Sequence, residues 1–334
     1  MDNNKLHLYR LSFSAPLHIG NERDDNSSGS SMVHSDTLYA AIFFAWDKLG
    51  KSEWIPSEQK KDTEFAVSSL FPFYQDNYFL PRPLYSPEIE YKELESTVIR
   101  KQIKKAAWVD TVIFQDSLND LPINYHGNNN FSDSFWSSNP LSEKAFITSQ
   151  VMPRVTVPRE GGEDTTIFYI ERFYFENEAG LYFLAQFDTI EQQQRLEAAL
   201  RLLGDEGFGT DRNIGHGKFS FEKKEASTFN FNFPKKKGLA VSLGLYCPLS
   251  KEETQTMLSK KAVGYDLVKR GGWLSEPYQS WRKKSVYMFR EGSVLGCSNP
   301  NPVFSMGENV NVNPKTVPVP HPVWRCGKTI FLSF

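Results

Sequence analysis

Cysteine is scarce in this chain of 334 residues, which has only Cys247, Cys297 and Cys326. The three are odd in number and widely spaced, and no CxxC pair is present. This pattern argues against a disulfide scaffold and against a zinc ribbon, and it fits a reducing cytoplasm. We therefore expect a cytoplasmic protein with no bound metal and no cofactor.

Long apolar runs are also lacking. The longest, Leu38–Trp46, has nine residues, whereas a membrane-spanning helix needs about 20. Met1 is followed by Asp2 and further polar residues, so no signal peptide is visible. The apolar content of 40%, with 26 Phe, 14 Tyr and 7 Trp, is nevertheless ample for packed cores. We expect a folded protein without a membrane partner.

Net charge is nearly absent overall, at −2, but it is distributed unevenly. Residues 1–211 hold 19 Lys and Arg against 32 Asp and Glu, a net of −13, whereas residues 212–334 hold 19 against 8, a net of +11. Such an asymmetry favours a polyanionic partner for the basic half, or two partner subunits with different surfaces.

Hydrophobic periodicity predicts the first elements of the fold. Leu6–Phe13 alternates apolar and polar residues, which is typical of a half-buried strand. A helix is predicted over Thr37–Leu49, with Ser35 or Asp36 as its cap and Gly50 as its stop.

The same patterns return after residue 165. Thr166–Phe175 and Leu181–Phe187 alternate on either side of a turn, which predicts a hairpin. A helical spacing then runs from Ile190 until Gly204, and a last alternating strand follows at Lys218–Lys223. The resulting βαββαβ order is that of a ferredoxin-like, RNA-recognition-type module in the α+β class.

The length favours two domains of about 150 residues rather than one. We expect an N-terminal ferredoxin-like domain over residues 1–233, with insertions at about 51–165 and a Gly-rich loop at 204–217. A C-terminal ferredoxin-like domain over residues 234–334 would begin with the strand Leu239–Tyr246 and end with Ile330–Phe334.

The Gly-rich loop, GDEGFGTDRNIGHG, has five glycines in fourteen residues. Exposed N–H groups in such a loop form anion-binding concavities, and the cations of Arg212, His216 and Lys218 favour phosphate. The loop lacks the GK[ST] of a Walker A motif. The alternative interpretation is a flexible connection.

Five stretches stand out by their order and spacing. They are PLHIG at Pro16–Gly20, SDTLYAAIFFAW at Ser35–Trp46, GFGTDRNIGHGKF at Gly207–Phe219, FREGSV at Phe289–Val294 and HPVWRCGKTIFL at His321–Leu332. Together they make the chain similar to the RAMP superfamily of CRISPR systems. Within that superfamily they resemble the subunit of type III-A (Csm) interference complexes that caps the 5′ end of the guide RNA.

The resemblance implies a non-catalytic scaffold in an antiviral ribonucleoprotein. Members of this group look like two ferredoxin-like domains that hold the 5′ repeat-derived handle of the crRNA. They also contact the large signature subunit and the backbone RAMP subunit. RNA at such sites is unpaired and is held through phosphates, base edges and stacking. The equivalent subunit of type III-B complexes is the nearest alternative, and HPVWRCGK favours III-A.

The candidate RNA-binding residues lie in several separate motifs. PRVTVPR, at residues 153–159, falls in the acidic half, and its alternative interpretation is a solvated strand face. SWRKK, at residues 280–284, also fits a packed Trp with a soluble face. The candidates are His18, Arg154, Thr156, Arg159, Gly207, Gly209, Arg212, Gly215, His216, Gly217, Lys218, Trp281, Arg282, Lys283 and Arg325.

Two other classes of function are weighed against the scaffold. Some RAMP relatives cleave precursor RNA without metal through a His, and His34 before the first helix is the candidate here, although it also fits an N-cap histidine. Asp36 fits a helix cap better than a catalytic Asp. A stand-alone RNA-recognition protein would show the aromatic RNP signature, which the predicted central strands lack. We expect no catalysis.

Overall fold

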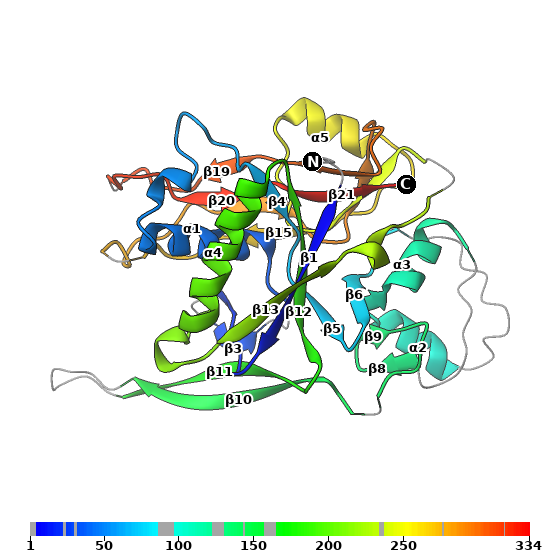
Figure 1. The fold of residues 1–334 in the computed structure, drawn as a ribbon, viewed down its shortest axis with the longest axis horizontal. Coiled ribbons are helices and arrows are strands. Elements are labelled where there is room, and N and C mark those ends of the chain that lie inside the picture. Colours follow the sequence, from blue (N-terminus) through cyan, green and yellow to red (C-terminus); the bar gives the residue numbers. More distant parts are fainter. Residues whose placement is uncertain are drawn as a thin grey trace.

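The computed structural model describes residues 5–22, 25–29, 32–85, 97–121, 130–142, 144–156, 165–233, 237–275, 277–316 and 318–334 (Figure 1). Two sheets carry most of the fold, one of nine strands and one of four. In the described part of the chain, none of the helices is long and apolar enough to cross a membrane.

The nine-stranded sheet contains strands from residue 6 to residue 225. Its pairs are antiparallel except β7 with β9, which is parallel. The order is β13 (Phe219–Glu225), β1 (Leu6–Phe13), β12 (Ala179–Phe187), β5 (Phe71–Tyr74), β6 (Asn77–Pro81), β7 (Trp108–Asp110), β9 (Phe135–Trp136) and β8 (Phe131–Ser132), with β4 (Phe65–Val67) also pairing β12.

Helices α1 (Ser35–Lys48) and α4 (Ile190–Glu206) pack together on one face of this sheet. Thr189 caps α4 by accepting the Gln192 N–H at 3.3 Å. The helix continues past Gly204, its predicted stop, to end before Gly207. A Cβ at Gly204 would meet the Phe219 carbonyl oxygen at 2.6 Å, so the glycine lets α4 lie close to β13.

The predicted cap of α1 is wrong. His34 occupies the N-cap position and makes no side-chain cap hydrogen bond. Ser35 instead accepts the Leu245 N–H at 2.9 Å and donates its own N–H to Ser69 Oγ at 2.8 Å. The start of α1 is therefore held by contacts from other parts of the chain.

The region at 51–165 is more than a set of loops, because β5 to β9 extend the main sheet. Helices α2 (Thr97–Lys105) and α3 (Thr111–Leu118) belong to it, and Asp110 caps α3 by accepting the Ile113 N–H at 2.9 Å. These strands have two to five residues each, which is too short for a period to be read from the sequence.

The hairpin predicted from Thr166 to Phe187 is wrong. β11 (Thr166–Phe175) pairs over its full length with β10 (Ile147–Thr156), forming the ribbon along the lower edge of Figure 1. β12 instead pairs with β1 on one side and with β4 and β5 on the other. All nine residues of β12 are buried, which fits a central strand, whereas β11 is partly exposed.

The four-stranded sheet follows residue 237 and has the order β17 (Val294–Gly296), β14 (Leu239–Ser242), β21 (Thr329–Ser333) and β18 (Val303–Met306). One α-helix, α5 (Lys251–Leu258), occurs in the described residues after 237 and packs on β17. Two ribbons complete this part: β15 (Leu267–Arg270) with β16 (Val286–Phe289), and β19 (Asn309–Asn311) with β20 (Trp324–Cys326).

A single hydrophobic core joins the two sheets. Leu6 and Leu8 of β1 belong to the same buried cluster as Val241 of β14 and Leu332 of β21. The division into domains at residue 234 therefore remains a proposal, since the two parts complete each other's core.

Candidate nucleic-acid interface

The Gly-rich loop folds back onto the PLHIG segment that follows β1. The Gly217 N–H donates to the Pro16 carbonyl at 2.8 Å, and the Thr210 N–H donates to the His18 carbonyl at 3.1 Å. Another ribbon, β2 (Gly20–Glu22) with β3 (Asp25–Gly29), follows PLHIG and lies beside β11. Two motifs some 190 residues apart in sequence are thus one structural unit.

The glycines of the loop serve close backbone packing. At Gly217, where φ is +69°, a Cβ would lie 1.8 Å from the Phe208 carbonyl oxygen. Gly207 and Gly209 are similarly crowded, by the carbonyl oxygens of His216 and His18. Gly215 differs, because a Cβ there would meet nothing within 4 Å. Only Gly215 of these four faces open space.

Most of the loop's N–H groups are used inside the protein. Seven of them donate to backbone carbonyls, so the expected concavity of exposed donors is wrong for these residues. They belong to Gly207, Phe208, Thr210, Ile214, Gly215, His216 and Gly217. An anion at the loop must therefore be held mainly by side chains.

Asp211 connects the loop to the β10–β11 ribbon. Arg154 of β10 lies 3.3 Å from each Asp211 oxygen, measured from Nη1 to Oδ1 and from Nη2 to Oδ2. Arg172 of β11 lies 3.6 Å from Oδ2. The structure therefore brings PRVTVPR to the Gly-rich loop, although the two lie in halves of opposite net charge.

Three buried polar atoms at this junction have no hydrogen-bond partner in the described residues: Arg172 Nε, Asp211 Oδ2 and His216 Nδ1. Burial and the positive charge of Arg172 lower the pKa of His216. This shift disfavours a charge on His216, so the main local cations are the arginines and Lys218. Two arginines around one carboxylate leave a positive excess.

Arg212 and Lys218 are the cations on the outside of the loop. The Arg212 guanidinium lies 4.0 Å from the centre of the Phe44 ring of α1, which orients it over an aromatic face. Lys218 is exposed at the start of β13. Both side chains are available to a phosphate, which guanidinium and ammonium groups bind in different geometries.

The three other candidates of residues 1–211 differ in how accessible they are to RNA. The His18 side chain is only 1% exposed and its Nδ1 lies 2.6 Å from the Glu171 carbonyl oxygen, so it supports β11 and is not accessible to RNA. Thr156 is exposed at the end of β10. Arg159 lies outside the described residues.

SWRKK lies in the loop between β15 and β16. Trp281 is 45% exposed, and the Arg282 guanidinium lies 4.8 Å from the centre of the Trp273 ring. Burial and the positive charge of Arg325 lower the pKa of Lys283 to about 8. This segment thus presents a partly exposed Trp281 together with several cations.

Arg325 is buried rather than placed for RNA. Its Nη1 donates to Asp36 Oδ2 at 2.7 Å and its Nη2 donates to the Gly271 carbonyl at 2.5 Å. Arg270 Nε donates to the same Asp36 oxygen at 2.9 Å. Burial alone would raise the pKa of Asp36, but Arg270 and Arg325 hold it well below its usual value. The expectation that Arg325 contacts RNA does not fit this burial.

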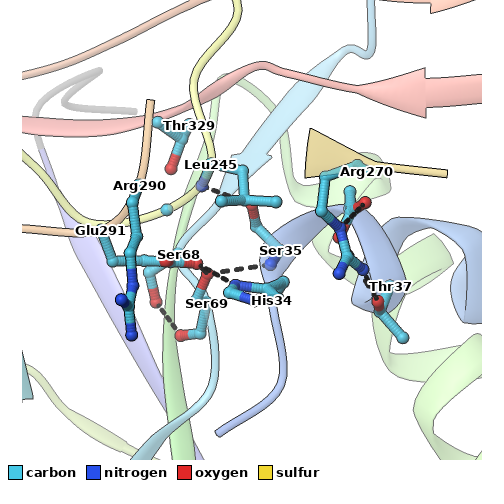
Figure 2. A network of polar contacts seen from close by, with 12 residues as sticks. His34, Ser35, Thr37, Ser68, Ser69, Leu245, Arg270, Arg290, Glu291 and Thr329 are labelled. Atoms are coloured by element: carbon cyan, nitrogen blue, oxygen red, sulfur yellow. Dashed lines mark hydrogen bonds and ion pairs between the residues drawn. The ribbon is translucent and has the colours of Figure 1, made fainter. Parts of the chain in front are cut away.

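A second buried network, shown in Figure 2, holds His34. Its Nδ1 lies 2.8 Å from Glu291 Oε1, and the Ser69 hydroxyl donates to the same oxygen. Burial disfavours the charge of Glu291, yet the His34 and Ser69 contacts lower its pKa. Glu291 belongs to the FREGSV motif, but the residue pattern alone assigns it no role.

Arginines contact α1 at two separate points along the helix. Arg212 stacks on Phe44, and Arg270 and Arg325 meet Asp36, eight residues earlier. At 1.5 Å per residue these points are about 12 Å apart along the helix. No group of acids, histidines or cysteines in the described residues is arranged to hold a metal ion.

Comparison with known families gives two adjoining matches. Residues 10–220 match the RAMP superfamily, and residues 235–334 match the CRISPR Csm4 C-terminal domain. Together the two matches span nearly the whole described fold.

The similar curated proteins are Csm4 proteins of CRISPR systems. The one from Thermococcus onnurineus is 26% identical over 235 residues, covering 69% of each chain. The one from Mycobacterium tuberculosis is 23% identical over 334 residues, covering 98% of this chain and 97% of the relative.

Solved structures share the fold across the chain. A chain of the Csm3–Csm4 subcomplex of a type III-A interference complex has a TM-score of 0.66 at 20% identity, with 99% of both chains covered. A chain of a Csm1–Csm4 cassette in complex with cA4 has a TM-score of 0.58 at 20% identity, covering 99% of this chain and 96% of that one.

Proposed function

Because the chain belongs to the RAMP superfamily, we propose that it is the subunit of a type III-A CRISPR effector complex that holds the 5′ repeat-derived handle of the crRNA. The observation that carries this proposal is the tandem match, in which a RAMP region is followed directly by a Csm4 C-terminal domain. A stand-alone RNA-recognition protein has no reason to carry the second part.

The proposed partners follow from the similar chains. Those chains occur in a subcomplex with Csm3 and in a cassette with Csm1. We infer that this protein likewise joins a backbone RAMP subunit and the large signature subunit, in the cytoplasm. Its role there is a bridge between the guide RNA and both proteins.

The proposed RNA surface has two parts. The first is the junction of the Gly-rich loop with the β10–β11 ribbon, where Arg154, Arg212 and Lys218 supply positive charge. The second is the SWRKK loop, where Trp281 offers a ring for stacking and Arg282 a cation. Single-stranded RNA is bound by this combination of backbone cations and stacking rings.

The proposed role is non-catalytic. Metal-independent RNA cleavage needs a general base positioned near a 2′-hydroxyl. Both Asp36 oxygens are engaged by arginines and its pKa is lowered, which makes it a poor base. His34 is held by the buried Glu291. Both groups fasten the start of α1 to residues after 237.

The test is reconstitution. Co-expressed with the backbone and large subunits and a crRNA, the protein should co-purify in one particle and protect the 5′ handle from nuclease. A crRNA whose handle is scrambled at constant length should lose that protection. Protection that is indifferent to handle sequence, or a protein that purifies alone, would contradict the proposal.

A further inference from the structure

A cavity of about 590 Å³ lies at the far end of β13 from the Gly-rich loop. It is bounded by the start of β1, the end of β13, the segment 226–233 and the strands β18 and β21. Lys223, on its lining, follows Gly217 of the loop by six residues, which is about 20 Å along the strand at about 3.3 Å per residue. It is therefore a different place from the proposed handle site.

The floor and one wall of the cavity are apolar and aromatic. Phe229 is buried at its base, and Phe231 and Phe233 are partly buried beside it. The rings of Phe231 and Phe233 lie 5.9 Å apart, with an angle of 30° between their planes. Each ring also contacts another one, Phe231 with Phe114 at 5.4 Å and Phe233 with Phe334 at 5.8 Å. The lining therefore offers a packed aromatic surface, against which a planar ligand can rest.

The rim carries positive charge. Its lysines are Lys5, Lys223 and Lys224. Lys224 forms an ion pair with Glu222, with 3.5 Å between Nζ and Oε2. Within the described part of the chain, Lys5 and Lys223 have no ion-pair partner. His7 also lines the cavity. Its pKa is lowered first by burial and then by the positive charges of Lys223 and Lys5. Glu225 also lines the cavity and offsets one lysine, so the lining keeps a net positive charge.

We propose that this cavity binds a nucleotide, with its base against Phe231 and Phe233 and its phosphate at Lys5 and Lys223. The volume falls within the range of about 300–1,000 Å³ that small ligands occupy. Asn230, on the same lining, offers an amide donor and acceptor for a base edge. The nucleotide is either free or part of an RNA chain that extends beyond the handle site.

The experiment uses two photoreactive probes on the purified full chain: 8-azido-AMP, and a decauridylate containing 4-thiouridine. Labelling is mapped by mass spectrometry, and the expected adduct lies in the tryptic peptide 225–235, which contains Phe231 and Phe233. Labelling by the mononucleotide identifies a free nucleotide as ligand. Labelling by the decauridylate alone identifies an RNA chain.

The double variant Lys5→Ala/Lys223→Ala should reduce this labelling about tenfold, since it removes two phosphate contacts of an exposed site. Phe231→Leu keeps an apolar side chain but loses the ring, and should reduce it about fivefold or more. The matched control is Lys101→Ala/Lys104→Ala, the same loss of charge on exposed lysines of α2. α2 directly precedes β7, which lies toward the opposite end of the main sheet from β13.

Arg212→Ala/Lys218→Ala should leave labelling of this peptide intact, so failure of the handle site and failure of the cavity are told apart. The proposal is overturned if neither probe labels peptide 225–235. It is also overturned if Lys5→Ala/Lys223→Ala labels as strongly as the α2 control.

Discussion

Asp36, in the first turn of α1, and Arg325, in β20 near the end of the chain, form a buried ion pair with 2.7 Å between Oδ2 and Nη1. The pair joins the RAMP region to the part that matches the Csm4 C-terminal domain. Arg270 of β15 completes the cluster. Arg325, a candidate RNA-binding residue, therefore fastens two parts of the molecule together.

Arg325→Ala should destabilise the protein by about 3 kcal/mol, because it leaves a buried carboxylate with one cation fewer. The measurement is the free energy of unfolding in urea. Arg290→Ala is the matched control, since its pair with Asp266 is more than half exposed on both sides and should contribute less than about 1 kcal/mol. Equal losses in the two variants would contradict a buried role for Arg325.

Acid should weaken this fastening in a defined direction. The folded-state pKa of Asp36 lies below its ordinary value of 3.8, so its stabilisation is complete above about pH 4 and is lost as the pH falls through the lowered pKa. Asp36→Asn should be less stable at pH 6 and show a shallower loss of unfolding free energy from pH 5 to pH 3. Parallel curves for the two proteins would contradict this assignment.

The glycines of the loop should differ sharply in what they tolerate. Gly217→Ala places a methyl group against the Phe208 carbonyl, so we expect a loss of several kcal/mol or a displaced loop. Gly215→Ala meets open space and should cost only about 1–2 kcal/mol for its left-handed conformation. Thermal unfolding of both variants, compared with handle binding, tests whether the loop's shape or its flexibility matters.

Arg212→Ala/Lys218→Ala should weaken handle binding and reduce its salt dependence, because fewer counterions are released. The slope of log K against log salt should fall by about 1.4 for two phosphate contacts on a single strand. The exposed pair on α2, Lys101→Ala/Lys104→Ala, is the control and should leave the slope unchanged. A slope that is insensitive to the loop variant would remove the loop from the RNA surface.

Precursor crRNA should remain intact when incubated with the purified protein, with or without Mg²⁺. His34→Ala should lower stability by about 1–3 kcal/mol, since it removes a hydrogen-bond partner from the buried Glu291. It should not change any RNA product. Specific cleavage that disappears in His34→Ala would establish an enzyme in place of a scaffold.

Much of the fold could be predicted where a pattern was long enough. β1, α1 and α4 could be predicted because their apolar periods run over eight or more residues, and the structure confirms all three. Strands β4 to β9 of the 51–165 region were missed because each has only two to five residues. The pairing of β11 with β10 was missed because pairing partners are set by burial across the whole sheet and not by the turn between neighbours.

In the candidate site, too, local patterns could be predicted from the sequence and tertiary contacts could not. Residue type and spacing identified the Gly-rich loop, but the contact of Arg154 with Asp211 spans 57 positions and leaves no local pattern. His18 and Arg325 carry the side chains that bind RNA in many proteins, and tertiary packing buried both. A sequence gives the chemistry of a side chain, whereas its accessibility depends on every element packed around it.

The hydrophobic core shared by β1 and β21 has a consequence for biosynthesis. Leu6 and Leu8 leave the ribosome long before Ile330 and Leu332, which lie in the same core. The nascent chain therefore carries uncovered apolar surface until β21 has emerged, a state that favours aggregation and chaperone binding. The main sheet is thus fully covered only after the second sheet has been synthesised.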